Sequence, residues 1–236
     1  MKKIIYFLAA IVLLASCSMN KSAVQSSNFE QAMNQISESV IKDSKERAKK
    51  TAKQLKRKGY YVDPMGLPMD IQLEKAILFE GIVDNSGNTR YIVEKARVVS
   101  KTPGTGKQHA TELAKITIAG YLQSHIVGLV QTDLTNQQLS LSEAEAINKS
   151  ISVYENWIAQ NLGSVIPVAV LYKDHKDHIE VFVNIAYDKG NVDELVSNKI
   201  VSKLAEDTNV AREKLEKVFH SDRFQNISSG TNNLLQ

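Results

Sequence analysis

The sequence has a single cysteine, Cys17, among 236 residues. One thiol excludes an intramolecular disulfide and a zinc site built from several cysteines. Net charge is also small, because 29 Lys and Arg oppose 26 Asp and Glu for a formal charge of +3, which does not argue for nucleic-acid binding. Apolar residues make up 43% and charged residues 23%, a globular composition that excludes a wholly disordered or collagen-like chain. At this length we expect one domain, or a domain with a smaller appended piece.

The N-terminus has the features of a secretory signal. Lys2 and Lys3 form a short positive segment, and residues 4–14 (IIYFLAAIVLL) form an apolar run. This run is too short to span a bilayer as a helix, which takes about 20 residues, but it fits the apolar core of a signal peptide. No later segment is expected to be long and apolar enough to span a membrane.

The residues after this run, Leu14-Ala15-Ser16-Cys17, resemble the lipobox of bacterial lipoproteins. The resemblance implies cleavage between Ser16 and Cys17, a diacylglycerol thioether on the Cys17 sulfur, and an acyl chain such as palmitate on the new amine. Two or three such chains anchor a protein stably, whereas one holds it only marginally. The alternative is an ordinary signal peptide in which the cysteine falls by chance.

The residues that follow bear on the destination of a Gram-negative lipoprotein. Ser18 stands where enteric-type sorting places the Asp that retains lipoproteins at the inner membrane. Residues 18–22 also lack the acidic run that resembles surface-export signals of some groups. We therefore expect the protein at the outer membrane, lipid-anchored on its periplasmic face.

A helix is expected from about Phe29 to Lys58, and its second half is strongly basic. Nine basic and two acidic side chains lie between Lys42 and Lys58, so this segment carries +7. Loss of the signal leaves a mature chain of +1, and the rest of that chain sums to −6. The simplest interpretation is a solvated helical face. The alternative is an electrostatic contact with an acidic membrane surface or polymer, for which the assigned residues are Lys45, Lys49, Lys53, Lys56 and Arg57.

Hydrophobic periodicity predicts an α+β fold, with one small antiparallel sheet packed on long helices. The expected strands are residues 90–100, 165–172 and 178–187, and the last two should form a hairpin. The expected helices, besides the basic one, are residues 70–80, 108–133, a helix from 140 and a final helix over 191–219.

Particular side chains sharpen this prediction. Ala48, Ala52 and Leu55 form a narrow stripe that should pack the basic helix against the rest of the protein. Ser140 and Glu143 have the spacing of a capping box. The strand over 178–187 alternates, with Ile179, Val181, Val183, Ile185 and Tyr187 on one face and Glu180, Phe182, Asn184 and Ala186 on the other.

The sequence Gly104-Thr105-Gly106-Lys107 invites comparison with a phosphate-binding loop. The Walker pattern needs a glycine five residues before its second glycine, and a Ser or Thr after the lysine. Lys101 and Gln108 occupy these positions. We therefore expect a solvated loop that leads into a helix.

His175 and His178 form a second cluster, together with Asp174 and Asp177. Imidazole and carboxylate groups are suitable ligands for zinc or copper. A hairpin turn, however, offers little support for orienting metal ligands, so a solvated turn is the preferred interpretation. A lipid-anchored enzyme or metal-binding protein that uses His175 and His178 is the alternative.

The remaining polar candidates do not suggest catalysis. His125 has no Ser, Cys or Asp at a recognisable catalytic spacing and is expected to be a partly buried histidine with a satisfied hydrogen bond. Glu143 and Glu145 are too close along a helix to point the same way. An acylated Cys17 is no longer a nucleophile. We therefore assign no catalytic residue, metal ligand or cofactor, and expect a protein that is not an enzyme.

Several segments share features with a known family: Tyr91–Ala96, His109–Lys115, Val168–Tyr172 and Val181–Tyr187, with an upstream stretch comprising Ala52–Tyr60, Leu67-Pro68 and Gln72-Leu73. Over residues 90–188 the chain resembles the LPP-twenty lipoprotein family, and the upstream stretch is similar to an N-terminal extension of its anaerobe members. The resemblance implies a dodecin-like small sheet on a long helix, membrane tethering, and relatives used in envelope and flagellar-surface assemblies.

Together these observations predict five segments: a lipoprotein signal peptide (1–16), a lipidated flexible tether (17–28), a helical basic extension (29–89), an LPP-twenty-like α+β domain (90–220) and a frayed tail (221–236). The expected function is a non-enzymatic binding or assembly module of the cell envelope. Its expected partners are the membrane, through acyl chains on Cys17, and other envelope proteins or a second copy of itself, but not nucleic acid.

Overall fold

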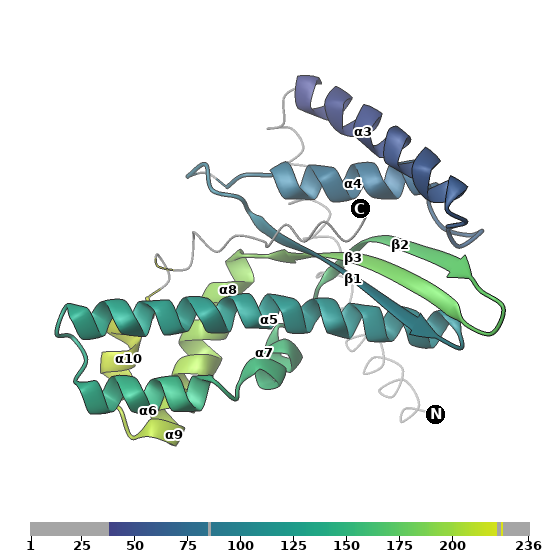
Figure 1. Ribbon diagram of the computed structural model, residues 1–236. Coiled ribbons are helices and arrows are strands. Elements are labelled where there is room, and N and C mark those ends of the chain that lie inside the picture. Colours follow the sequence, from purple (N-terminus) through teal and green to yellow (C-terminus); the bar gives the residue numbers. More distant parts are fainter. Residues whose placement is uncertain (1–37, 85, 221–222, 224–236) are drawn as a thin grey trace, which may run out of the picture.

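The computed structural model describes residues 38–84, 86–220 and Arg223. The predicted signal peptide, the tether, the first part of the basic helix and all of the predicted tail except Arg223 (221–222 and 224–236) lie outside the described residues. Within the described residues, three strands form one antiparallel sheet in the order β1-β3-β2 (Figure 1). Helices α3 and α4 lie on one side of this sheet and α5 on the other. The predicted α+β fold is confirmed.

The central strand of the sheet is β3 (Ile179–Asp188). It pairs along its length with β1 (Tyr91–Ser100) and forms the predicted hairpin with β2 (Ile166–Asp174). Strand β2 contains a register shift between Pro167 and Ala169, near a residue that cannot donate a ladder hydrogen bond. All three strands are rich in β-branched and aromatic residues, which suit a pleated and partly buried surface.

Both faces of β3 are buried, and its side chains alternate as predicted. Val181, Val183 and Ile185 belong to the large core that includes α5 (Pro103–Thr135). Phe182 packs with residues of α3 (Glu38–Arg57) and α4 (Met69–Gly81), and Ala186 packs with further residues of α4. The alternation therefore places one layer of helices on each face of the sheet.

Helix α5 provides the main contact with the sheet. Its sequence predicts an apolar stripe of Ala110, Ala114, Ile118, Leu122, Ile126 and Leu129. The first five are completely buried, and Leu129 is partly buried. By length and composition alone, α5 is also long and apolar enough to cross a membrane, contrary to the prediction for segments after the signal. The core helix of a soluble protein meets the same criteria, and the stripe of α5 packs against β1 and β3.

The start of α5 corrects the prediction of a loop at residues 104–107. The helix begins at Pro103, because Thr102 caps it by accepting a hydrogen bond from the Thr105 N–H (3.3 Å) and proline is tolerated in the first turn. Gly106 is buried, and a Cβ atom there would overlap a methyl group of Val181. This glycine therefore lets α5 approach β3 closely.

Short helices surround the second half of α5 (Figure 1): α6 (Leu141–Ile151), α7 (Glu155–Asn161), α8 (Gly190–Glu194), the π-helical segment η1 (Leu195–Ile200), α9 (Val201–Thr208) and α10 (Arg212–Val218). The helix predicted from residue 140 begins at Leu141, but the apolar face that the sequence predicts for it, up to Ile158, is interrupted because the chain turns at 152–154 between α6 and α7. The predicted final helix is likewise divided. Asn209 has a φ of 57° and ends α9, within residues 207–209, where the sequence predicts a weak point in this helix.

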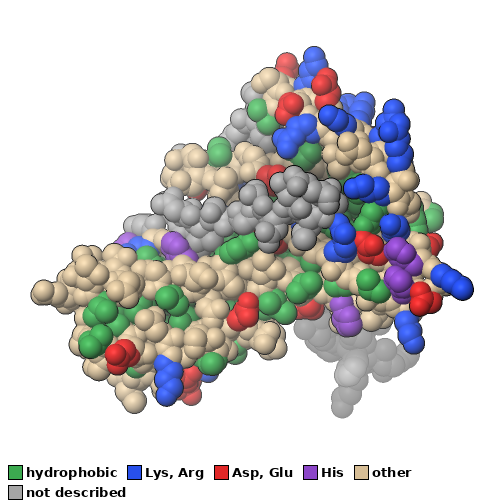
Figure 2. Space-filling view, viewed as in Figure 1, with side chains coloured by type: hydrophobic (Ala, Val, Ile, Leu, Met, Phe, Trp, Pro, Cys, Tyr) green, Lys and Arg blue, Asp and Glu red, His purple; other side chains and the backbone are tan. Residues whose placement is uncertain are grey.

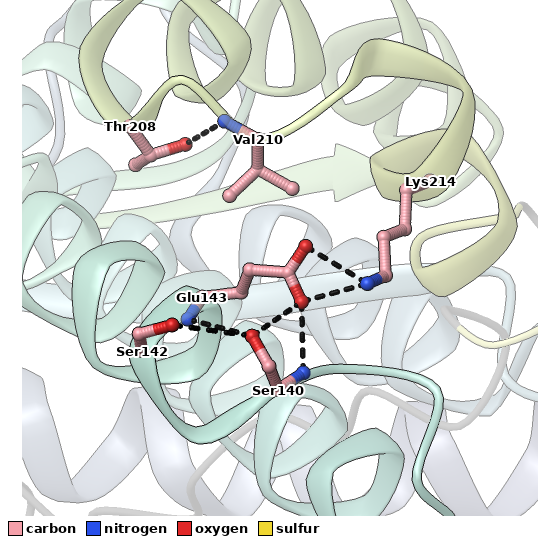
Figure 3. Close-up of polar contacts among 6 residues, drawn as sticks. All are labelled: Ser140, Ser142, Glu143, Thr208, Val210 and Lys214. Atoms are coloured by element: carbon pink, nitrogen blue, oxygen red, sulfur yellow. Dashed lines mark hydrogen bonds and ion pairs between the residues drawn. The ribbon is translucent and has the colours of Figure 1, made fainter.

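The predicted capping box at the start of α6 is confirmed (Figure 3). The Ser140 hydroxyl accepts a hydrogen bond from the Glu143 N–H (3.3 Å), and the Glu143 carboxylate accepts one from the Ser140 N–H (2.8 Å). The same carboxylate accepts hydrogen bonds from Lys214 of α10 (2.6 and 2.8 Å). The Lys214 contact first, and then those of Ser140, lower the pKa of Glu143 to about 2. Glu143 thus joins α6 to α10.

Candidate functional site

The buried side of α3 determines which of its residues face water. Ala48, Ala52 and Leu55, the predicted stripe, are at most 3% exposed. They form a cluster with residues of α4 and with Leu171 and Phe182 of the sheet. Because the stripe is narrow, most of the circumference of α3 is left for polar side chains.

The basic side chains of α3 lie on that outer circumference. All nine basic residues between Lys42 and Lys58 are exposed, and Figure 2 shows Lys and Arg side chains gathered over this part of the molecule. A helix turns by about 100° per residue, so five lysines fall within roughly 80° of one another: Lys42, Lys45, Lys49, Lys53 and Lys56. They form a continuous ridge, here called the lysine ridge, beside the buried stripe.

Little negative charge neutralises this ridge. Arg47 forms an ion pair with Asp43 (3.8 Å) on a different side of α3. In the part of the chain that the structure describes, no ion pair is found for Lys45, Lys49, Lys53, Lys56 or Arg57. The five residues predicted to contact an anionic surface are therefore brought together and exposed, without an ion pair to any other described residue.

A shallow groove runs beside the ridge, between α3 and the first turn of α4. It has a volume of about 490 Å³, and its lining consists of Lys49, Ala52, Lys53, Lys56, Arg57 and Asp70. Four cationic side chains and one carboxylate therefore border the same groove. A second groove on the opposite side of α3 has mixed charges, since Asp43, Arg47 and Glu80 line it.

The β2 edge of the sheet holds α3 and α4 in this arrangement. Tyr61, just after α3, exchanges two backbone hydrogen bonds with Tyr172 (2.8 and 2.9 Å). On α4, the Gln72 side chain accepts a hydrogen bond from the Val170 N–H (2.8 Å). The buried Tyr60 donates a hydrogen bond to Glu180, and burial first and then this bond raise the pKa of Tyr60 to about 12. The groove is thus built on the sheet and is not a feature of α3 alone.

The predicted histidine cluster lies on the β2–β3 turn, but its members have different partners. The rings of His175 and His178 stack with their centroids 4.5 Å apart. His178 Nδ1 is 2.8 Å from the Asp177 carboxylate, and His175 Nε2 is 3.4 Å from Glu180. Asp174 instead accepts a hydrogen bond from the Tyr61 hydroxyl (2.8 Å). Among the described residues, no group of three or more His, Cys, Asp or Glu side chains could hold a metal ion.

The expectation for His125 is confirmed. The residue is half-buried on α5, and its Nε2 lies 2.6 Å from the backbone oxygen of Arg223. The Arg223 guanidinium also binds the carboxylate of Asp133, which is completely buried. These contacts attach Arg223 to α5. The other predicted site residues, Ser16 and Cys17, lie outside the described residues.

Glu94 is a buried titratable group that the sequence interpretation missed. It lies on β1, is 3% exposed, and has a pKa that burial raises to about 7. Tyr121 of α5 forms a hydrogen bond with its carboxylate. The sequence pattern does indicate that Glu94 is buried, because Glu94 lies on the same face of β1 as the buried residues Ile92 and Ala96.

Comparison with known proteins bears on the N-terminus. Residues 1–18 match a family model described as a prokaryotic membrane lipoprotein lipid attachment site. This match, over 18 of the 236 residues, supports a bacterial lipoprotein. It also supports a signal peptide and membrane anchoring through acyl chains, palmitate among them. No curated protein and no solved structure matches the chain, so the LPP-twenty-like and dodecin-like features stay predictions.

Proposed function

We propose that this lipid-anchored protein is a non-enzymatic binding or assembly module on the periplasmic face of the outer membrane. In this proposal the lysine ridge and Arg57 supply a second, electrostatic contact with an anionic surface. The observation that carries it is the ridge itself: clustered cations, all exposed, with no ion pair among the described residues. Each basic residue near an anionic membrane contributes about 1 kcal/mol, and the contribution weakens with salt.

The acyl chains make a weak contact of this kind effective. Anchoring through Cys17 confines the protein to one surface, so a second contact forms at a high effective concentration. The ridge then controls how the domain is oriented on that surface, and which of its faces is free for another envelope protein. A module that positions other envelope proteins must itself have a fixed orientation on the membrane.

Vesicle co-sedimentation tests the electrostatic contact. The mature chain (residues 17–236) is used with Cys17→Ser, so that no acyl chain contributes. We expect binding to vesicles that contain phosphatidylglycerol and little binding to phosphatidylcholine vesicles. Binding should fall between about 0.1 M and about 1 M salt, as the Debye length shortens from about 10 Å to about 3 Å. Equal binding to both vesicles, or binding independent of salt, would contradict the proposal.

Membrane fractionation tests the outer-membrane location, for which Ser18 is the supporting residue. Produced with its signal in an enteric-type host, the lipidated protein is expected in the outer-membrane fraction. Ser18→Asp is expected to shift it to the inner membrane, and Ser18→Asn serves as a matched uncharged control. Recovery of the unchanged protein in the inner-membrane fraction would contradict this location.

A further inference from the structure

The connector between α3 and α4 exposes large apolar side chains. Met65 is 95% exposed and Leu67 is 54% exposed. Ile71, in the first turn of α4, is 40% exposed. Three apolar side chains within seven residues therefore face solvent at one end of the protein, where each adds to the unfavourable hydration of apolar surface.

Hydrogen bonds within the connector hold these side chains outward. The Asp63 carboxylate accepts a hydrogen bond from the Met65 N–H (2.9 Å), and the Asp63 carbonyl accepts one from Gly66 (2.8 Å). The Leu67 carbonyl accepts a hydrogen bond from the Gln72 side-chain amide (2.7 Å). The oxygen of the same amide accepts a hydrogen bond from the backbone N–H of Val170 in β2. The exposed position of Met65 and Leu67 is thus part of an ordered turn fixed to the sheet.

The apolar connector and the cationic groove adjoin. Asp70, which lines the groove, directly precedes Ile71. Lys56 and Arg57 end α3 where the chain turns toward the connector (Figure 1). The same end of the molecule therefore presents an apolar tip beside four cationic side chains and the two carboxylates of Asp63 and Asp70. An apolar tip with a net positive flank favours the interface of an anionic bilayer.

We propose that this end of the protein inserts into an anionic membrane, with Met65 and Leu67 entering the boundary between head groups and acyl chains. Lys49, Lys53 and Lys56 then contact the anionic head groups. The inference rests on the proposed function and makes it more specific, because it identifies the anionic surface as a bilayer and not a soluble acidic polymer. Positive charge alone would bind either surface, whereas the exposed Met65 and Leu67 side chains can be buried only in a bilayer.

The anchor on Cys17 permits this orientation. The predicted tether after Cys17 (residues 18–28) can span at most about 40 Å, and a helix from the predicted start at Phe29 to Arg57 is about 44 Å long. A helix tilted away from the membrane normal therefore keeps both its anchor and its far end at the surface. The far end of α3 can therefore reach the membrane that holds the acyl chains. No rearrangement of α3 or α4 is required.

Site-specific fluorescence tests insertion directly. Cys17 is the only cysteine, so a mature Cys17→Ser chain with Met65→Cys takes one polarity-sensitive label. Val153→Cys is the matched control, since Val153 is 76% exposed in the turn between α6 and α7. On phosphatidylglycerol vesicles, the label at position 65 should shift to the blue and be quenched by nitroxide lipids, while the label at 153 should do neither.

A second variant measures what the apolar tip contributes. Met65→Ser combined with Leu67→Ser should lower partitioning of the Cys17→Ser chain into phosphatidylglycerol vesicles at least about tenfold. Val153→Ser should leave partitioning unchanged. Circular dichroism should show the same thermal unfolding midpoint for the double variant and the unchanged chain.

The outcomes separate this inference from the proposed function. If the unchanged chain binds anionic vesicles but the label at 65 is not quenched and the double serine variant binds equally well, insertion is wrong and the electrostatic contact stands. Oligomers that disappear in the double serine variant, without quenching, would assign the tip to a second copy of the chain and overturn insertion. Failure of the unchanged chain to bind anionic vesicles would overturn both proposals.

Discussion

Helices α5 and α3 lie on opposite faces of one sheet, and they differ in what their side chains do. α5 has two lysines and two acids over Pro103–Thr135 and buries large side chains such as Ile118, Leu122 and Ile126 completely. α3 has eight basic and three acidic side chains over Glu38–Arg57. Its buried apolar residues are Ala48, Ala52 and Leu55. α5 therefore chiefly supports the fold, whereas α3 packs through a small apolar contact and exposes its charged side chains to solvent.

The largest expected effect comes from a cavity under α5. Leu122→Ala should lower the free energy of unfolding by about 2–5 kcal/mol, because it removes a fully buried side chain and leaves a void. Leu113→Ala is the control on the same helix, since Leu113 is 43% exposed, and should change it by less than about 1 kcal/mol. Urea unfolding measures both. Equal losses would mean that the stripe of α5 is not the main core.

The second prediction concerns how the free energy of unfolding depends on pH, and it tests whether Glu94 is buried between the sheet and α5. The pKa of Glu94 is raised from 4.5 to about 7, so between these values the native protein binds more protons than the unfolded chain. Stability should therefore fall as pH rises through this window, by up to about 3 kcal/mol. Glu94→Gln should remove this contribution. Unfolding in urea at pH 4.5 and pH 8 compares the two proteins, and a parallel pH dependence would contradict the burial of Glu94.

A smaller effect concerns the helices around α5. Ser140→Ala should lower the free energy of unfolding by about 1 kcal/mol, because the Glu143 N–H at the start of α6 loses its acceptor. Ser142→Ala is the neighbouring control and should have a smaller effect. Thermal unfolding followed by circular dichroism compares the two, and a larger loss at Ser142 would contradict the capping box.

Local patterns were sufficient to predict much of the fold. The period-2 alternation of β3 and the stripe of α5 depend on neighbours in the sequence, and both were confirmed. The start of α5 was missed because Pro103, Gly104 and Gly106 are typical of loops. The helix start itself is local, since Thr102 caps it and Pro103 lies in its first turn. Only the close approach of Gly106 to Val181 is tertiary. The division of the last helix at Asn209 agrees with the weak point that the local sequence predicts, whereas the turn at 152–154 between α6 and α7 was not predicted.

Local sequence patterns were also sufficient to predict part of the candidate site. Once Ala48, Ala52 and Leu55 are assigned to the buried side of α3, exposure of its lysines follows from helical geometry. The groove does not follow, because Asp70 reaches it only through the packing of α4 against α3. The turn around Met65 follows from Asp63, Pro64 and Gly66, but the position of this turn beside the groove depends on how α3 and α4 pack on the sheet.

One pair of variants tests most directly whether surface binding and stability belong to different regions. The first replaces Lys49, Lys53 and Lys56 by Gln. The second replaces Lys107, Lys149 and Lys217, which are exposed on α5, α6 and α10, and removes the same charge. Both are made in the mature Cys17→Ser chain and measured for partitioning into phosphatidylglycerol vesicles and for urea unfolding.

We expect the α3 variant to lose at least about tenfold in partitioning, while its free energy of unfolding stays within about 0.5 kcal/mol of the unchanged chain. The control variant should keep most of its binding. Equal loss of binding in the two variants, or unchanged binding in the α3 variant, would contradict the assignment of the anionic-surface contact to α3.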